Sequence, residues 1–207
     1  MKNNIFIMGD SYSTYGGYIP EGYHTYYCDE RTDSPVVRGV EKTWWRILAK
    51  ENDLNIVLND SFSGSTICNT VRENLTVESS FISRIDKYID ENFFDENKID
   101  TMLIFGGTND SWIDVPIGEN KYSEWTADEL KCALPAFCYL IDKAKTVVEN
   151  IVVIINTELK EEITGGFMEV CKKKEIPCVV LKGIDKENGH PTEIGMKQIA
   201  MQVSELL

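Results

Sequence analysis

Three polar residues in separate parts of the chain could together cleave an ester: Ser11, Asn109 and His190. A serine hydroxyl becomes a nucleophile when a base takes its proton, and histidine is a common base near neutral pH. An asparagine amide can donate a hydrogen bond to the oxygen that becomes negative during acyl transfer. These residue types therefore predict acyl-transfer chemistry, provided that the fold brings the three side chains together.

Ser11 follows a short apolar run, residues 5–8, that stops at Gly9-Asp10. Such a run predicts a buried parallel strand that ends in a turn, which would place the serine hydroxyl at the edge of a sheet. The hydrolase nucleophile elbow Gly-x-Ser-x-Gly is absent because residue 13 is serine. A Gly-Asp-Ser sequence can also form a plain turn or a helix cap. The hypothesis that Ser11 is a nucleophile therefore depends on residues found elsewhere in the chain.

The rest of the chain alternates between strand and helix patterns. Further strands are expected at residues 55–59, 101–105, 150–156 and 177–181. Helices are expected at residues 41–52, 81–94 and 127–149, then up to Lys174 with an interruption at 165–166, and finally up to Leu207, whereas residues 111–126 are expected to form a loop. This alternation predicts one α/β domain over residues 1–207, with a mostly parallel five-stranded sheet and helices on both faces.

Ligands bind beyond the carboxyl ends of the strands in such sheets. Ser11 follows the first expected strand, Gly64 the second, Asn109 the third and His190 the fifth. Glycine at 64 suits a backbone that must approach a ligand closely, because it has no Cβ. Each residue also has a structural alternative: Gly64 as a turn glycine, Asn109 as a cap, and His190 as a residue preceding a helix. The other histidine, His24, has no such context and is the weaker candidate for a base.

These blocks, in this order, resemble the GDSL or SGNH hydrolase family. Residues 9–13 resemble its first block, Gly64 its second, Gly107-Thr108-Asn109-Asp110 its third and His190-Pro191 its last. The resemblance implies a serine hydrolase on a flavodoxin-like α/β/α fold, acting on esters or thioesters of lipids, carbohydrates or small molecules.

The same resemblance implies a role for each residue. Ser11 is expected to be the nucleophile and His190 the base, and an oxyanion hole would consist of the backbone N–H groups of Ser11 and Gly64 with the Asn109 side chain.

The acid that orients the histidine departs from the family pattern. Asp-x-x-His would place an aspartate at 187, where this chain has Glu187, and Asp185 is the second candidate. Either carboxylate could accept the Nδ1 proton of His190, and a backbone carbonyl could do so instead. The register favours Glu187, but the choice stays open at this point.

A loop over residues 12–27 holds six of the nine tyrosines and lies next to Ser11 in the sequence. Tyrosine offers a flat apolar face with a hydroxyl, which suits a sugar or another polar, ring-bearing ligand. Tyr12, Tyr15 and His24 of this loop, with Trp112, are therefore candidate substrate contacts. The alternative is that these rings pack on one another and hold the loop. We expect an ester such as an O-acetyl or other short acyl group on a carbohydrate or small molecule.

Composition excludes some partners. The net charge of −13 argues against nucleic acid and against an anionic membrane surface. The first apolar run is too short for a signal segment or a membrane span, which predicts a cytoplasmic protein. There is no phosphate-binding glycine motif and no metal-ligand spacing, so neither a cofactor nor a metal is expected, and oligomeric state is not predicted.

Two other functions compete with a serine esterase. One is a non-catalytic carbohydrate- or ligand-binding domain on the same fold. The other is a cysteine-dependent enzyme that uses Cys28 or Cys68 with a histidine. The six cysteines lack zinc or redox spacing and are expected to be reduced, mostly buried thiols.

Overall fold

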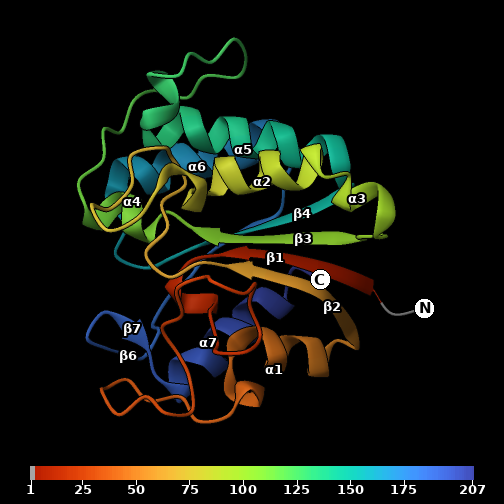
Figure 1. Ribbon diagram of the computed structural model, residues 1–207, viewed down its shortest axis with the longest axis vertical. Coiled ribbons are helices and arrows are strands. Elements are labelled where there is room, and N and C mark those ends of the chain that lie inside the picture. The colour runs from red at the N-terminus through yellow and green to blue at the C-terminus, as the bar shows by residue number, and fades with distance from the viewer. Residues whose placement is uncertain (1–2) are drawn as a thin grey trace.

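A parallel sheet forms the middle layer of the protein, with its strands in the order β2-β1-β3-β4-β5. The computed structural model describes residues 3–207. The strands are β1 (Asn3–Gly9), β2 (Leu54–Ser61), β3 (Thr101–Gly106), β4 (Asn150–Ile155) and β5 (Cys178–Val180). Every neighbouring pair is parallel, so the carboxyl ends of all the strands meet at one edge, on the left in Figure 1. The predicted fold class is confirmed.

Helices cover both faces of the sheet (Figure 1). On one face lie α2 (Phe81–Asp90), α5 (Ala133–Val147) and α6 (Glu161–Lys174), and on the other α1 (Trp44–Glu51) and α7 (Glu193–Ser204). Each face has its own apolar core: Phe81, Phe137 and Phe167 are buried on the first, and Trp44 and Met196 on the second. Because both faces of the sheet are buried, the strands appear in the sequence as short apolar runs and not as alternating apolar and polar residues.

Short elements occupy the loops. They are the helices α3 (Phe93–Glu96) and α4 (Thr108–Trp112), the 3₁₀ turns η1 (Ser11–Ser13), η2 (Val40–Lys42), η3 (Val77–Ser79) and η4 (Glu129–Lys131), and the strands β6 (Lys186–Glu187) and β7 (His190–Pro191). Strands β6 and β7 form an antiparallel hairpin, with Asn188 and Gly189 at its turn. Both turn residues have positive φ (48° and 76°), the backbone that an Asn-Gly hairpin turn requires.

Several predicted boundaries are wrong for identifiable reasons. The helix expected over 81–94 breaks at Asn92, which adopts a left-handed conformation (φ 56°). The helix expected over 127–149 begins only at Ala133, after η4. The glycines at 165–166 do not interrupt α6, because Gly166 provides the space for Leu134, which a Cβ there would meet at 2.4 Å. The short helix α4 begins in the expected turn and extends into the expected loop.

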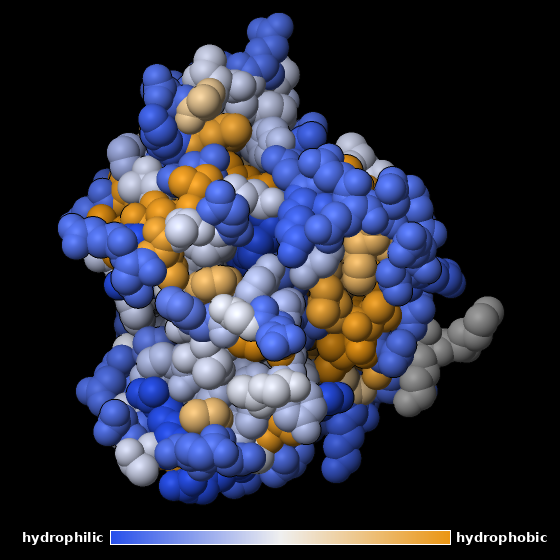
Figure 2. Space-filling model, viewed as in Figure 1, coloured by the Kyte–Doolittle hydropathy of each residue, from blue (hydrophilic) through white to orange (hydrophobic). Residues whose placement is uncertain are grey.

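The surface is mixed in polarity. Figure 2 shows that hydrophilic residues cover most of one face and that apolar residues gather in patches, one of them over the edge strand β2. Ile56 and Leu58 of this strand are only partly buried. Across residues 3–207, no helix combines the length and the apolar character needed to cross a bilayer.

Candidate active site

Ser11 and His190 meet at the carboxyl edge of the sheet although 179 positions separate them in the sequence. The imidazole Nε2 lies 2.9 Å from the serine Oγ, within hydrogen-bond distance. Both residues are largely buried, with 3% and 7% of their surface exposed. This geometry allows His190 to take the hydroxyl proton of Ser11.

The turn after β1 positions Ser11 as the first residue of η1. The Asp10 carboxylate caps this turn by accepting a hydrogen bond from the Tyr12 backbone N–H at 3.0 Å. Gly9 allows the turn to pack closely, because a Cβ there would lie 2.5 Å from the Ser61 Oγ. Gly9 and Asp10 therefore each have a physical role in placing Ser11.

The third partner of the pair is a backbone carbonyl, not a carboxylate. The Nδ1 of His190 lies 3.2 Å from the carbonyl oxygen of Asn188, two residues earlier in the β6–β7 hairpin. Glu187 is exposed, and the carboxylate of Asp185 accepts a hydrogen bond from the Thr192 hydroxyl. Within residues 3–207, neither carboxylate forms a hydrogen bond with the His190 imidazole, although Glu187 pairs with His190 through the backbone of the hairpin. This corrects the expectation that one of the two acids orients the imidazole.

His190 is held neutral by its surroundings. Burial lowers its pKa to about 4, and the positive charges of Arg31, Lys186 and Arg72 act in the same direction, against the raising effect of the Asn188 carbonyl. The imidazole is therefore unprotonated at neutral pH, the state in which it can act as a base.

Gly64 lies in the loop after β2 and has a φ of +89°, which favours glycine. The N–H groups on either side of it are used: Ser63 donates to the His24 carbonyl and Ser65 to the Phe62 carbonyl. Within residues 3–207 no hydrogen bond from the Gly64 N–H is found. This donor is therefore available beside Ser11, with which Gly64 shares a cleft.

Asn109 lies in α4, directly after β3. Its Nδ2 donates to the Ser65 carbonyl at 2.9 Å, and its Oδ1 accepts two hydrogen bonds from Arg72. The next residue, Asp110, accepts hydrogen bonds from the backbone N–H groups of Ile67 and Cys68. These contacts fasten the loop that carries Gly64 to the helix that carries Asn109.

A cleft of about 550 Å³ opens over the Ser11–His190 pair. Of the predicted substrate contacts, His24 and Trp112 line it. Tyr12 and Tyr15 do not line it, contrary to expectation, because both rings are buried and their hydroxyls are engaged with the protein: Tyr12 donates to the Gly189 carbonyl and Tyr15 to the Asp29 carboxylate.

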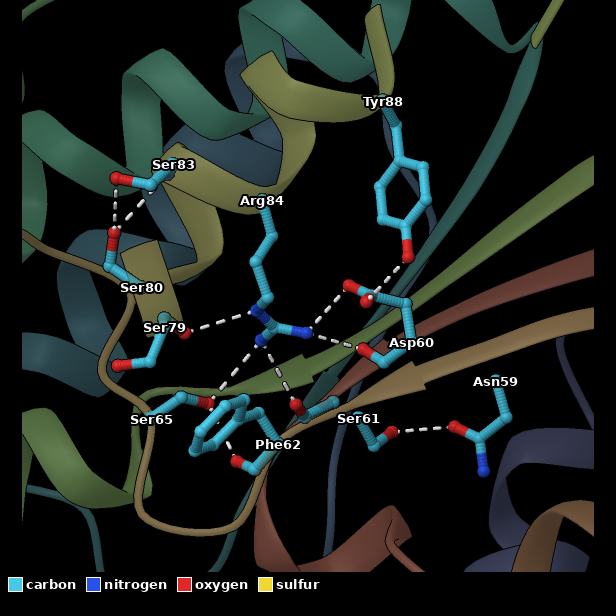
Figure 3. Close-up of polar contacts among 11 residues, drawn as sticks. Asn59, Asp60, Ser61, Phe62, Ser65, Ser79, Ser80, Ser83, Arg84 and Tyr88 are labelled. Carbon is cyan, nitrogen blue, oxygen red and sulfur yellow. Dashed lines mark hydrogen bonds and ion pairs between the residues drawn. The ribbon is translucent and has the colours of Figure 1, made fainter. Parts of the chain in front are cut away.

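A buried arginine ties together the segments that carry these residues (Figure 3). Arg84 of α2 forms an ion pair with Asp60 at 2.6 Å, and both side chains are at most 1% exposed. Its Nη2 also donates to the Gly9 carbonyl at 3.1 Å and to the Ser65 Oγ at 3.3 Å. Arg84 thus links the end of β1, just before Ser11, to the loop just after Gly64.

Four residues at or near the site were missed by sequence reasoning: Tyr26, Arg72, Arg84 and Asn188. Arg84 was detectable, since it lies on the same helical face as Phe81 and Tyr88, where a charge needs a partner. The Asn188-Gly189 dipeptide was also a readable hairpin signal. Arg72 lies in an irregular loop, where no periodicity marks a contact.

No group of three or more His, Cys, Asp and Glu side chains within the described chain is arranged to hold a metal ion.

A parallel α/β sheet that carries a serine–histidine pair at its carboxyl edge is an arrangement used by hydrolytic enzymes. Sequence comparison identifies the family, because the model of the GDSL-like lipase/acylhydrolase family matches residues 3–207. The chain belongs to this family, as its sequence blocks predict. No curated protein matches the chain by sequence.

Solved structures agree with this membership. A Bacteroides uniformis protein described as a GDSL-like lipase is 37% identical, with a TM-score of 0.90 over 100% of this chain and 95% of that one. A Bacteroides ovatus protein of the same description is also 37% identical, with a TM-score of 0.88 over 100% and 98%. Est24, a carbohydrate acetylesterase from Sinorhizobium meliloti, shares the fold at 14% identity, with a TM-score of 0.62 over 99% and 98% of the chains.

Proposed function

We propose that this protein is a serine esterase that forms an acyl-enzyme on Ser11. The observation that carries the proposal is the 2.9 Å contact between the Ser11 Oγ and the His190 Nε2, at the base of an open cleft. A nucleophile needs a base within this distance, and a low pKa keeps the base unprotonated at neutral pH.

In the first half of the reaction, the Ser11 Oγ attacks the ester carbonyl carbon while His190 Nε2 accepts the hydroxyl proton. The carbonyl oxygen becomes negative, and the N–H groups of Ser11, Gly64 and the Asn109 amide stabilise it. The C–O bond to the alcohol then breaks, and His190 returns the proton to the leaving oxygen. In the second half, His190 deprotonates water, the water oxygen attacks the acyl carbon, and Ser11 recovers its proton as the carboxylic acid leaves.

The Asn188 carbonyl takes the place that a carboxylate has in the Ser-His-Asp arrangement. It accepts the Nδ1 proton, so it selects the tautomer in which Nε2 is free to receive the serine proton. A carbonyl carries only a partial charge, so it stabilises the imidazolium less than an ionised acid would. The pair therefore acts as a dyad with a neutral orienting group.

The cleft favours a short acyl group on a carbohydrate or another polar small molecule. Its walls include the aromatic side chains of Tyr26 and Trp112 together with the polar side chains of His24 and Asn74. Flat rings combined with hydrogen-bonding groups suit a sugar ring. A related fold in Est24, a carbohydrate acetylesterase, is consistent with this substrate class.

A cysteine nucleophile finds no support in the site. Neither Cys28 nor Cys68 lines the cleft over His190. Cys68 is buried, and burial raises the pKa of its thiol far above the usual range, which suppresses the reactive thiolate.

Hydrolysis of p-nitrophenyl acetate by the wild type and by Ser11→Ala tests the proposal. We expect the variant to fold normally and to lose at least about 10³-fold in kcat, as removal of a catalytic-triad member does. Cys68→Ala is the matched control and should keep wild-type turnover. Equal rates for wild type and Ser11→Ala would refute the proposal, and no turnover by either across acyl lengths would favour a binding domain.

A further inference from the structure

We propose that Arg72 is a positioning residue for the oxyanion hole, acting through the side chain of Asn109. This inference rests on the proposed function, since it concerns how that reaction's negative oxygen is stabilised. It adds a residue that lies outside the sequence blocks on which the family resemblance depends.

Arg72 holds one end of the Asn109 amide. Its Nε and Nη2 lie 3.2 and 2.9 Å from the Asn109 Oδ1, so two donors of one guanidinium converge on a single acceptor. Hydrogen bonds from a charged donor are roughly twice as strong as neutral ones. Arg72 is therefore a firm anchor for this amide.

Arg72 and the Ser65 carbonyl together determine which way the amide faces. Arginine has only donors, so the atom that faces Arg72 must be the carbonyl oxygen of Asn109 and not its NH₂ group. The NH₂ group then faces the other way, where one of its two hydrogens is donated to the Ser65 carbonyl at 2.9 Å. One N–H remains for a substrate oxygen. Without Arg72, only the Ser65 carbonyl would oppose a flip of the amide, and a flipped amide would present an acceptor to that oxygen and would repel it.

The Arg72 side chain also lies close to Gly64, the second predicted donor. A Cβ built on Gly64 would lie 3.4 Å from the Arg72 Cδ, in van der Waals contact. The stem of this side chain thus packs beside the Gly64 backbone while its guanidinium holds Asn109. Arg72 thus holds one of the three groups assigned to the oxyanion hole and lies beside a second.

The charge of Arg72 is not neutralised locally. Among residues 3–207, the ion pairs do not include Arg72, and the residues that line the cleft include no aspartate or glutamate. The partner of the guanidinium is the neutral Asn109 oxygen. A fixed positive charge beside this amide polarises its N–H toward the developing oxyanion, which favours the transition state over the ground state.

A double-mutant cycle on p-nitrophenyl acetate hydrolysis tests this coupling. Arg72→Met should lower kcat roughly 10- to 100-fold and leave KM within about 2-fold, because the contact matters most in the transition state. Asn109→Ala should lower kcat by a similar or larger factor. If Arg72 acts through Asn109, Arg72→Met in the Asn109→Ala background should cost less than about 3-fold.

Two further variants make the result decisive. Arg72→Lys keeps one charged donor and should recover part of the kcat lost in Arg72→Met. Arg38→Met removes an exposed arginine that does not line the cleft and should leave kcat unchanged. If Arg72→Met folds poorly, the comparison of Arg72→Lys in the two backgrounds gives the same coupling.

An unchanged kcat in Arg72→Met, or losses that multiply in the double variant, would overturn the inference. Either outcome would leave the esterase proposal standing if Ser11→Ala is inactive. If Ser11→Ala retains wild-type turnover, the proposed function itself fails. The two failures are therefore distinguishable.

Discussion

The phenol ring of Tyr26 lies flat against the imidazole of His190, with ring centroids 3.6 Å apart and planes inclined by only 8°. The guanidinium of Arg31 also lies over the Tyr26 ring, with its Cζ 3.9 Å from the ring centroid. The stack restricts the imidazole plane, while Ser11 and the Asn188 carbonyl engage its two nitrogens. Stacking thus contributes to an orientation that a carboxylate enforces in the Ser-His-Asp arrangement.

Loss of the stacked ring should slow the chemical step. Tyr26→Leu is expected to lower kcat about 10-fold, because the imidazole gains freedom to rotate away from Ser11. Tyr26→Phe keeps the ring and should remain within about 2-fold of the wild type, which separates stacking from the hydroxyl. Steady-state kinetics on p-nitrophenyl acetate measure both, and equal losses in the two variants would count against the stacking role.

In the pH profile of kcat/KM, the decrease at low pH (the acid limb) should follow the His190 pKa of about 4. The pKa is lowered, so the imidazole stays neutral as the pH falls through 6 and becomes protonated, with loss of activity, only near pH 4. Arg31 is one of the charges that lower this pKa, so Arg31→Met should move the limb to higher pH. A profile of kcat/KM from pH 3.5 to 8 checks both expectations. A limb that stays in place or moves lower in the variant would contradict them.

The two acids near His190 in the sequence should be dispensable for chemistry. Glu187→Gln and Asp185→Asn are each expected to keep kcat within about 3-fold, because the Asn188 carbonyl holds Nδ1. Replacing a true orienting aspartate costs about 10⁴-fold in the Ser-His-Asp template. A loss of that order in either variant would show that an acid orients the imidazole after all.

Gly64 should tolerate no side chain without a cost to activity. An alanine there would hold a φ of +89°, and its Cβ would meet Leu75 at 3.3 Å and Arg72 at 3.4 Å. The backbone N–H would then shift, and we expect kcat to fall roughly 10- to 100-fold. Gly165→Ala is the control, since Gly165 lies in α6 with open space at its Cβ position and should keep full activity. Wild-type kcat in Gly64→Ala would remove this donor from the mechanism.

The buried ion pair should matter for stability. Arg84→Met leaves the Asp60 carboxylate buried without its charged partner, and breaking such a pair costs about 3–5 kcal/mol. Urea unfolding monitored by tryptophan fluorescence measures the change. The double variant Arg84→Met/Asp60→Asn should recover part of the loss, since no unpaired charge remains. A single variant as stable as the wild type would mean that Asp60 finds another partner.

Much of this architecture was readable because the signals are local. The run over residues 5–8 and the clear strand at 101–105 are apolar on both faces, as strands covered by two helical layers must be. The rule that ligands bind at the carboxyl edge then brought Ser11 and His190 to the same place without any knowledge of their contact. The family blocks pointed to the same residues.

The incorrect and missing predictions have one cause: they concern residues whose contacts are set by long-range packing. Tyr12 and Tyr15 looked like substrate contacts because tyrosine is amphipathic, but their hydroxyls found protein partners in distant segments. The orienting group is a main-chain carbonyl, and a sequence pattern of side chains does not reveal it. Arg72 contacts Asn109 across 37 positions, through a loop with no repeating pattern.

Labelling with a fluorophosphonate, followed by peptide mapping, shows whether Ser11 is an activated nucleophile, because the reagent reacts with an activated serine hydroxyl. We predict one modified residue, Ser11, in the wild type, and labelling slowed at least about 10²-fold in His190→Ala, which lacks the base. Modification of another residue, or a Ser11 labelling rate that does not depend on His190, would show that Ser11 is not a nucleophile activated by His190.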